Sequence, residues 1–299
     1  MTDLIEAPVP VERPEKTTLL SRRRVLRRVF RNPLAMVGLI VVSAAVLLAA
    51  LAPLIAPFPY DGTDFTAPAP APPSPHHWFG TDELGRDQFS RVLFGLRASV
   101  IVGALAVVLS VLIGVPLGLL AGFYGWVDPI VSRLTDLLLA FPFLILAVGL
   151  AVIIGPSLLT AIIALGVGQI PGMVRVTRGE TLRLRGMDYV GASFANGAGD
   201  ATVLGRHILP NSVNAILVQA TVYVPQAIIG EAVLSFLGLG VRPPTPSLGV
   251  MLASAQPFYH DGPWMAVFPG VVIVVLTLAL NLLGDGLRDA LDPKERRAT

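Results

Sequence analysis

Cysteine is absent from the 299-residue chain, and charged residues are scarce at 14% of the composition. Without cysteine the chain cannot form a disulfide framework, a thiolate metal site or a thiol redox centre. Soluble domains usually carry about 25% charged residues, whereas this chain replaces charge with hydrophobic residues, which make up 54% of it. The composition therefore excludes an ordinary soluble protein and indicates an integral membrane protein.

Sequence motifs for nucleotide binding and for catalysis are also missing. No segment matches Gly-x-x-x-x-Gly-Lys-Ser/Thr, so the chain has no loop that could bind the phosphates of ATP. The four histidines (His76, His77, His207 and His260) have no nucleophile and base at a supporting spacing. The net charge of +2 is not concentrated on a soluble domain, so it does not predict nucleic-acid binding. We therefore predict no enzyme activity, no cofactor and no nucleic-acid partner.

Long uncharged windows predict the membrane spans. A bilayer core of about 30 Å needs roughly 20 helical residues, and one window is long enough for two spans. Its two halves are separated by the turn signal Gly155-Pro156-Ser157. The sequence therefore predicts an all-α membrane protein with six transmembrane helices. The windows cover residues 34–56, 98–127, 137–174, 207–230 and 262–284.

Basic residues are distributed unevenly between the two sides of these spans. Most of the 22 lie in the N-terminal tail (1–33), the C-terminal tail (286–299) and the polar segment 175–211. The positive-inside rule then predicts that both termini and the polar segment are cytoplasmic, in a protein of the plasma membrane. The first 20 residues, in which prolines alternate with charges, are expected to be disordered. The basic residues on the opposite side are Arg86, Arg91, Arg97 and Arg242.

Residues 57–97 are predicted to lie outside, as a Pro/Ala-rich tether followed by an amphipathic helix. Apolar residues at i, i+3, i+4 and i+7 form one face of that helix, which we expect to lie in the outer membrane interface. A metal site is not predicted, because the acidic residues match no known loop pattern and His76 and His77 lie in the tether. The apolar face consists of Phe89, Val92, Leu93 and Leu96.

Small residues and prolines recur inside the predicted spans. Glycines at four-residue spacing, Gly114, Gly118 and Gly122, favour close packing between helices. Prolines within a span remove a hydrogen bond and predict kinks. Those prolines are Pro116, Pro142, Pro171 and Pro225.

The polar segment 175–211 is too long for a simple hinge. Residues 188–196 are predicted to form about two helical turns that stop at Asn196-Gly197. Asp200 is expected to cap a second short helix that ends near His207, and Pro210 to terminate it before the next span. A compact helix-turn-helix is expected, with a well-capped surface loop as the alternative. Its arginines are Arg175, Arg178, Arg183, Arg185 and Arg206.

Several strings occur in a fixed order along nearly the whole chain. They are Phe79-Gly80-Thr81-Asp82, Gly85-Arg86-Asp87, the run from Glu231 to Gly240, and the run from Gly284 to Pro293. With them the chain resembles the second permease subunit of the dipeptide, oligopeptide and nickel group of ATP-binding-cassette (ABC) importers. The resemblance implies the type I importer fold, with a five-helix core (98–285) after an N-terminal helix (34–56).

Within that family, the polar segment corresponds to the cytoplasmic loop that receives force from a separate ATPase. The family pattern is Glu-Ala-Ala, then Gly after three residues, then Leu-Pro. Ala192 and Gly197 match it, whereas Gly191 and Ser193 replace the first and third residues of the triplet. The resemblance implies a coupling role for Gly191, Ala192, Ser193, Gly197, Asp200, Arg206, His207, Leu209 and Pro210.

The resemblance also implies partners. They are a homologous permease subunit forming a heterodimer, ATP-binding cassette subunits, and an external solute-binding protein that delivers di- or oligopeptides. Nickel chelates or glutathione are alternative substrates. A competing hypothesis is an ion-coupled secondary transporter or channel, for which Glu231 is the best intramembrane carboxylate and Asp136 a second polar candidate. A local partner, backbone or Arg242, is the favoured role of Glu231.

Overall fold

The computed structural model describes residues 30–64 and 69–291. The disorder expected for residues 1–20, most of the basic N-terminal tail and the end of the C-terminal tail lie outside the described residues. Within them the chain is helical, apart from two isolated β-bridges, Thr63 with Arg86 and Thr81 with Asp87. The all-α prediction is confirmed.

Five helices in the described part of the chain are long and apolar enough to cross a membrane. Shorter helices lie between them: α7 (Asp188–Ala195), α10 (Leu248–Ala255) and the 3-10 turn η2 (Gln256–Phe258). The five long helices are α2 (Pro33–Ile55), α3 (Gln88–Phe123), α6 (Leu158–Arg185), α11 (Trp264–Leu291) and one continuous helix, Asp200–Phe236, which comprises α8 (Asp200–Thr202), the π-helical turn η1 (Val203–Ile208) and α9 (Leu209–Phe236).

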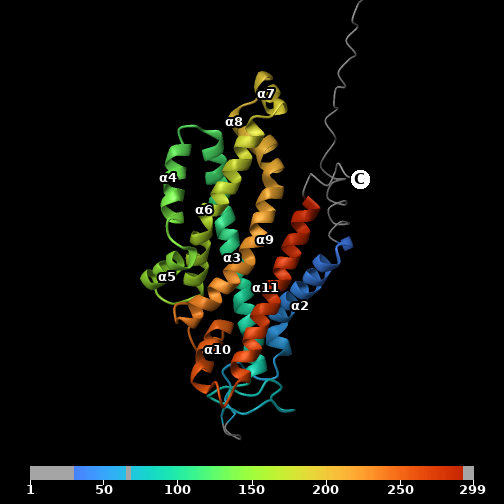
Figure 1. Cartoon of the computed structure of the whole chain (residues 1–299), viewed down its shortest axis with the longest axis vertical. Coiled ribbons are helices and arrows are strands. Elements are labelled where there is room, and N and C mark those ends of the chain that lie inside the picture. The colour runs from blue at the N-terminus through green and yellow to red at the C-terminus, as the bar shows by residue number, and fades with distance from the viewer. Residues whose placement is uncertain (1–29, 65–68, 292–299) are drawn as a thin grey trace, which may run out of the picture.

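The sixth predicted span is a broken one. Helices α4 (Asp128–Leu139) and α5 (Phe143–Ile154) meet at an angle of 89°. Pro142 lies between them with an extended backbone, ψ 135°. Proline has no N–H to donate and disfavours a helical conformation in the preceding residue, Phe141. The chain therefore leaves the helix at this point, so the predicted kink is a sharp corner that places α5 beside α6 (Figure 1).

The amphipathic helix expected in the outer interface is the first part of α3, which runs without interruption from Gln88 to Phe123. The predicted boundary at residue 97 therefore falls inside a helix. Asp87 caps the start, because its side chain accepts a hydrogen bond from the Ser90 N–H at 2.7 Å. Arg91 lies off the predicted apolar face of this helix, yet it is 2% exposed and its Nε lies 3.2 Å from Asp82 Oδ2. This ion pair holds the base of α3 inside the protein.

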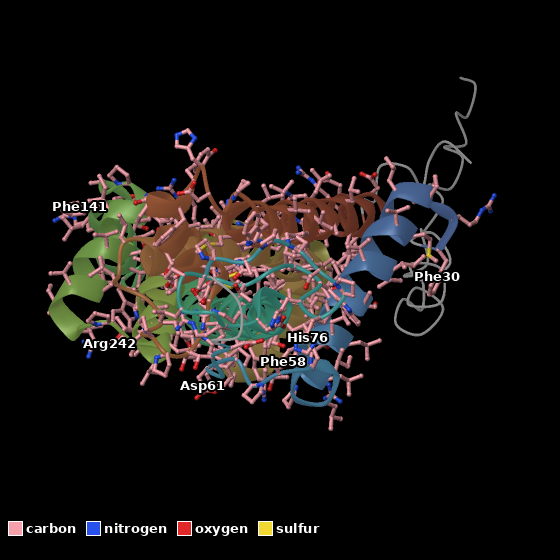
Figure 2. All side chains as sticks on the ribbon, turned by 90° about the horizontal axis from the view of Figure 1, so that it is seen from below. Phe30, Phe58, Asp61, His76, Phe141 and Arg242 are labelled. Atoms are coloured by element: carbon pink, nitrogen blue, oxygen red, sulfur yellow. The ribbon has the colours of Figure 1, made fainter. Side chains whose placement is uncertain are left out.

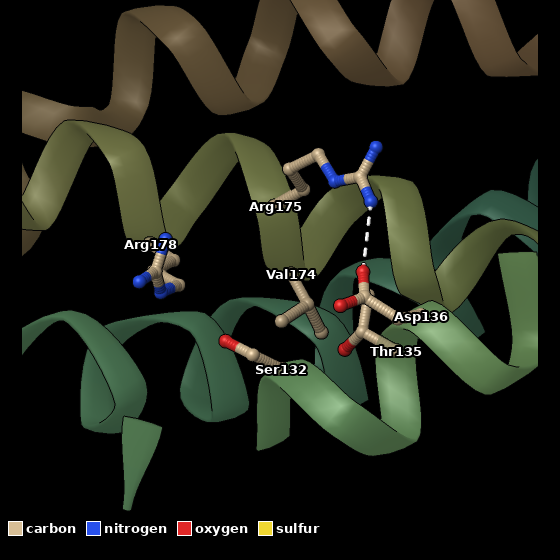
Figure 3. A pocket seen from close by; sticks show the side chains of 6 residues that line it. All are labelled: Ser132, Thr135, Asp136, Val174, Arg175 and Arg178. Carbon is tan, nitrogen blue, oxygen red and sulfur yellow. Dashed lines mark hydrogen bonds and ion pairs between the residues drawn. The ribbon is translucent and has the colours of Figure 1, made fainter. Parts of the chain in front are cut away.

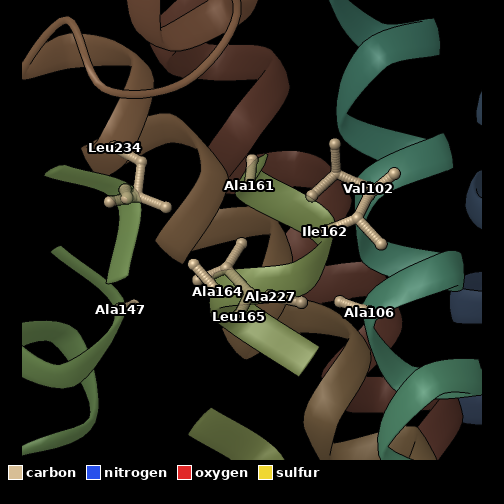
Figure 4. Close-up of a cluster of buried hydrophobic side chains, with 10 residues drawn as sticks. Val102, Ala106, Ala147, Ala161, Ile162, Ala164, Leu165, Ala227 and Leu234 are labelled. Carbon is tan, nitrogen blue, oxygen red and sulfur yellow. The ribbon is translucent and has the colours of Figure 1, made fainter. Parts of the chain in front are cut away.

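Helices α3, α6 and α9 form the centre of the bundle. The glycine repeat on α3 lies against α6, and a Cβ added at Gly118 would be 2.7 Å from Thr177 Cβ. Only glycine permits this approach of the two backbones, so the predicted close packing is confirmed. Figure 4 shows the adjoining core, where side chains from α3, α6 and α9 meet. The core includes Val102, Ala106, Ala161, Ile162, Leu165, Ala227 and Leu234.

The two ends of the molecule differ in structure. At one end, α7 and α8 project beyond the other helices (Figure 1). At the opposite end, the segment before α3 folds across the bundle; we call its described part, residues 57–64 and 69–87, the cap. Figure 2 views the molecule from the cap end and shows Phe58, Asp61 and His76 together there.

Candidate functional site

The projecting end is formed by residues 186–208, which we call the knob. Helix α6 leads into it and ends at Arg185. Helix α7 forms the first half, and the second half is continuous with α9. The knob is therefore attached to two helices that run through the centre of the bundle (Figure 1).

The first half of the knob matches the prediction for residues 188–196. Helix α7 ends at Ala195, and Gly197 adopts φ +82°, a conformation that favours glycine. The Ala198 N–H donates to the Ser193 carbonyl at 3.1 Å, and the Gly197 N–H donates to the Phe194 carbonyl at 2.9 Å. These two bonds form a Schellman motif, which satisfies the last carbonyls of α7. The predicted helix stop at Asn196-Gly197 is confirmed.

The second half of the knob corrects the prediction at two residues. Gly199, not Asp200, is the N-cap of α8, and Asp200 lies in the first turn with an exposed side chain. Pro210 does not end the helix, because it lies in the first turn of α9. The π-helical turn before it makes this possible: the Leu209 N–H bonds to the Leu204 carbonyl, five residues back. In this π-helical register the helix continues through Pro210 although proline has no N–H to donate.

The inner side of the knob is an apolar core. Val190 from α7 and Val203 and Ile208 from η1 are fully buried. They pack against two residues outside the knob, Phe123 at the end of α3 and Leu184 at the end of α6. Sequence reasoning missed these two residues, although both end apolar helices next to the polar segment. Burying each such side chain stabilises the structure by about 1.5–3 kcal/mol, so the knob is held firmly to α3 and α6.

The outer side of the knob is exposed and partly apolar. Tyr189 is 43% exposed and Phe194 is 40% exposed, so they do not contribute to the core as Val190 does. Gly191 and Ala192 are exposed beside them. Partial burial raises the pKa of the Tyr189 phenol, which therefore stays a neutral hydroxyl at physiological pH. This surface offers apolar contacts and a hydroxyl to another protein.

The arginines of the polar segment are mostly paired. Arg185 donates to the Phe123 carbonyl at 2.7 Å and lies over the Phe123 ring at 5.4 Å, which fixes α3 to α6. Arg183 donates from Nε to Glu180 at 3.0 Å. Arg206 is exposed and makes no hydrogen bond or ion pair among the described residues. It lies next to His207, whose ring is 6.3 Å from that of Tyr189.

Asp136, a candidate intramembrane polar residue, lies beside Arg175. Its Oδ1 lies 3.1 Å from Arg175 Nη2, at a cavity of about 260 Å³. Figure 3 shows this pair with the other side chains that line the cavity. One turn further along α6, Arg178 forms a two-bond pair with Asp128, with Nη2 to Oδ2 at 2.7 Å. Both side chains of the Asp136–Arg175 pair are more than 60% exposed, so it contributes at most about 1 kcal/mol. These pairs connect α4 to α6.

Glu231, the other candidate, is completely buried at the cap end of α9. Its carboxylate accepts hydrogen bonds from Ser99 of α3 and from Ser235 of α9, each at 2.8 Å. Ser235 in turn accepts from the Val241 N–H at 3.2 Å. The expected partner Arg242 is exposed and does not contact it. Glu231 therefore connects α3, α9 and the loop after α9 through serine hydroxyls.

Comparisons with known proteins agree with this architecture. Residues 114–297 match the family model for the binding-protein-dependent transport system inner membrane component. The chain belongs to this family. Residues 22–73 match the model for the N-terminal transmembrane domain of oligopeptide transport permease C. The predicted membership in the peptide group of permeases, with an extra N-terminal helix, is confirmed.

The chain is similar to curated permeases over nearly its whole length. It is 41% identical to the dipeptide transport system permease protein DppC of Alkalihalophilus pseudofirmus, over 98% of this chain and 96% of that one. It is 41% identical to the glutathione transport system permease protein GsiD of Pectobacterium atrosepticum, over 96% of each. Identity to the oligopeptide permease OppC of Bacillus subtilis is 42%, over 96% and 94%.

Among solved structures, a chain of the MetNI methionine ABC transporter in an inward-facing conformation has the same fold. The TM-score is 0.56 at 21% identity, and the match covers 68% of this chain and 96% of that one. The protein is thus a multi-pass permease subunit of a bacterial inner-membrane ABC importer. It works with an ATP-binding subunit and a binding protein, and ATP is hydrolysed on separate subunits. The ion-coupled transporter hypothesis is not favoured.

Proposed function

We propose that the knob of this permease is the surface on which the ATP-binding subunit acts. The observation that carries the proposal is the contrast between its two sides, an inner side packed on Phe123 and Leu184 and an outer side that exposes Tyr189 and Phe194. A rigid contact is needed to transmit force, and an exposed apolar surface is needed to receive a partner. The proposed coupling residues are Gly191, Ala192, Ser193, Gly197, Asp200, Arg206, His207, Leu209 and Pro210.

Force on the knob has two direct routes into the membrane. Helix α6 ends immediately before it, and α9 continues from its second half without a break. Movement of the knob therefore acts directly on α6 and α9, and α3 follows because Phe123 belongs to the same apolar core. ATP binding by the partner subunits favours one tilt, and hydrolysis restores the other, so two states are biased by differential contacts at the knob.

Gly191→Arg tests the contact in the complete transporter reconstituted in proteoliposomes. A Cβ at Gly191 meets no atom within 4 Å, so the substitution leaves the fold intact and adds bulk only to the outer surface. We expect solute uptake to fall at least tenfold while the subunit still inserts and ATP hydrolysis loses its stimulation by the binding protein. Gly179→Arg, at an exposed position on α6 with equally open surroundings, is the matched control. Normal coupled uptake in Gly191→Arg would refute the proposed contact.

We infer that the chain pairs with a homologous permease subunit, with both termini and the knob in the cytoplasm. Exposed apolar side chains on α5, such as Ile145 and Ile153, support a covering by lipid or by that second subunit. The cysteine-free sequence makes orientation easy to test, since a single cysteine at exposed Asp289 or Asp61 is then the only label site. An impermeant thiol reagent added to whole cells is expected to label position 61 and not position 289. Transport by the chain paired only with itself would contradict the heterodimer.

We propose di- and oligopeptides as the transported solutes. The support is the similarity to the dipeptide and oligopeptide permeases and to the permease for glutathione, which is itself a peptide. Competition with labelled dipeptide uptake by the reconstituted transporter separates the alternatives: dipeptides, longer peptides and glutathione should compete, and free amino acids and nickel chelates should not. If only nickel chelates competed, the substrate class would be nickel chelates and not peptides.

A further inference from the structure

Two histidines and an aspartate meet in the cap, at the opposite end of the molecule from the knob. One possible ligand atom from each of Asp64, His76 and His77 lies within 4.8 Å of the others. His77 is buried, Asp64 is half-buried and His76 is exposed. The imidazole rings of the two histidines are 4.9 Å apart and nearly perpendicular. This cluster was not predicted, because the proline-rich residues 68–75 separate Asp64 from the two histidines in the sequence.

Backbone hydrogen bonds hold the two halves of the cluster in place. The Asp64 N–H donates to the Gly85 carbonyl at 2.9 Å, and Gly85 has φ +72° in a turn that a Cβ could not enter without meeting the Asp64 carbonyl. On the other side, the His77 N–H donates to Ser74 Oγ at 3.0 Å, and the Ser74 N–H donates to the His77 carbonyl at 2.8 Å. The positions of Asp64 and His77 are therefore set by the fold of the cap.

Asp87 orients the His77 ring. Its Oδ1 lies 2.8 Å from His77 Nδ1, while its Oδ2 accepts from the Ser90 N–H at the start of α3. A carboxylate fixed in this way accepts a hydrogen bond from Nδ1–H and leaves Nε2 with its lone pair directed toward Asp64 Oδ2, 3.3 Å away. An aspartate that orients a histidine through the nitrogen opposite the metal is the usual support of metal-binding histidines.

We propose that Asp64, His76 and His77 bind a divalent transition metal ion, with Asp87 as the positioning residue. Zinc bonds of about 2.0–2.2 Å in a tetrahedron place neighbouring ligand atoms roughly 3.3 Å apart, which equals the 3.3 Å between His77 Nε2 and Asp64 Oδ2. Two imidazoles and one carboxylate favour Zn²⁺, Cu²⁺ or Ni²⁺ over Mg²⁺ or Ca²⁺. Three protein ligands leave the fourth position of a tetrahedral ion open.

A cavity beside the cluster provides room for that fourth ligand. It has a volume of about 310 Å³, and its lining includes Phe58, Thr63, Asp64, His77 and Asp87. The cavity is large enough for a water molecule or for a donor group of a small solute. The bound ion would connect Asp64, in the first part of the cap, to His76 and His77 in its second part and so stabilise the cap.

Metal binding to the complete transporter, purified with a tag that contains no histidine, tests this site directly. Samples are equilibrated with Zn²⁺ and a competing chelator, and the bound metal is counted by mass spectrometry, so neither ATP hydrolysis nor uptake enters the readout. We expect one high-affinity Zn²⁺ per chain, absent from His76→Ala and Asp64→Asn. His76 is exposed, so its replacement does not endanger folding. His260→Ala, another exposed histidine, is the matched control and should retain the ion.

Asp87→Asn tests the positioning role, because asparagine retains an oxygen to cap α3. Loss of such a supporting carboxylate typically weakens metal affinity about 10–100-fold, and that decrease is the expected result. A competing explanation of the geometry is a protonated His77 held between Asp64 and Asp87 without any metal. Equal Zn²⁺ content in the wild type, His76→Ala and Asp64→Asn would overturn the proposal and favour that explanation.

Discussion

The knob and the cap hold their shapes in opposite ways. The knob is braced by apolar side chains, Val190, Val203 and Ile208 against Phe123 and Leu184. The cap is braced by buried charges: Asp82 and Arg86 are both less than 10% exposed and are joined at 2.7 Å. One end of the molecule thus relies on burial of hydrocarbon, and the other on fixed polar geometry.

The difference corresponds to different tasks. Apolar contacts have no direction, so the knob can follow α3 and α6 when these helices tilt without losing a specific bond. A buried network of charges permits only one arrangement, because breaking it leaves an unpaired charge in the interior. We therefore expect the cap to be the rigid end of the subunit during transport and the knob to be the end that moves.

The largest effect is expected from Asp82→Ala, which tests whether the stability of the cap depends on its buried charges. Asp82 contacts Arg86 and Arg91 and also accepts from the Leu84 and Arg86 N–H groups. Its removal leaves buried Arg91 without its carboxylate partner and Arg86 with Glu83 alone, which should cost about 3–5 kcal/mol. Thermal unfolding in detergent should show the loss, and the exposed Asp61→Ala should not. An unchanged melting temperature for Asp82→Ala would mean that the cap does not depend on its charges.

An intermediate effect is expected in the knob. Ile208→Ala removes a fully buried side chain and should destabilise the knob by about 2–5 kcal/mol, whereas Ile208→Val should cost about 0.5–1.5 kcal/mol. Faster amide hydrogen exchange should be confined to residues 186–208, with the cap unchanged. The number of ATP molecules hydrolysed per solute transported should rise in the same order. If exchange in the cap accelerated equally, the two ends would not be independent.

The difference between apolar packing in the knob and buried charges in the cap also explains how well each could be predicted from the sequence. The structure of α7 depends on neighbouring residues, so Asn196-Gly197 was sufficient to place its end correctly. The continuation of α8 into α9 was missed, because Pro210 predicts a break and the π-helical turn that accommodates it has no sequence signal. The sequence could place the proposed coupling residues in one segment but not show that Phe123 and Leu184 pack against that segment, since those contacts are tertiary.

The cap was predicted poorly for a physical reason. The burial of Arg91 was not predicted, because a helical wheel shows only that it lies off the apolar face and not what lies against its own side. Its partner Asp82 belongs to the tether, whose path over the end of α3 is set by long-range bonds such as that from the Trp264 indole to the Thr81 carbonyl at 3.1 Å. The serine partners of Glu231 were missed in the same way, since Ser99 lies 132 residues away.

The smallest effect is predicted for one substitution, glycine to alanine, made at two positions in the knob. Gly191 and Gly197 are both exposed, and a Cβ at either meets no atom within 4 Å. Only their backbones differ: Gly191 is inside α7, and Gly197 has φ +82°. Gly191→Ala should therefore stabilise α7 by about 0.5–1 kcal/mol, and Gly197→Ala should destabilise the knob by about 1–2 kcal/mol.

Hydrogen exchange of the Ala198 N–H, which closes the Schellman motif, measures both changes in the same place. Exchange should slow in Gly191→Ala and accelerate in Gly197→Ala. Opposite signs would show that the local stability of the knob is set by backbone conformation at its exposed tip and by apolar packing beneath it. If the exchange rate changed in the same direction in both variants, the added methyl group would act through a partner subunit that covers both glycines. The contact surface would then extend from α7 to the turn after it.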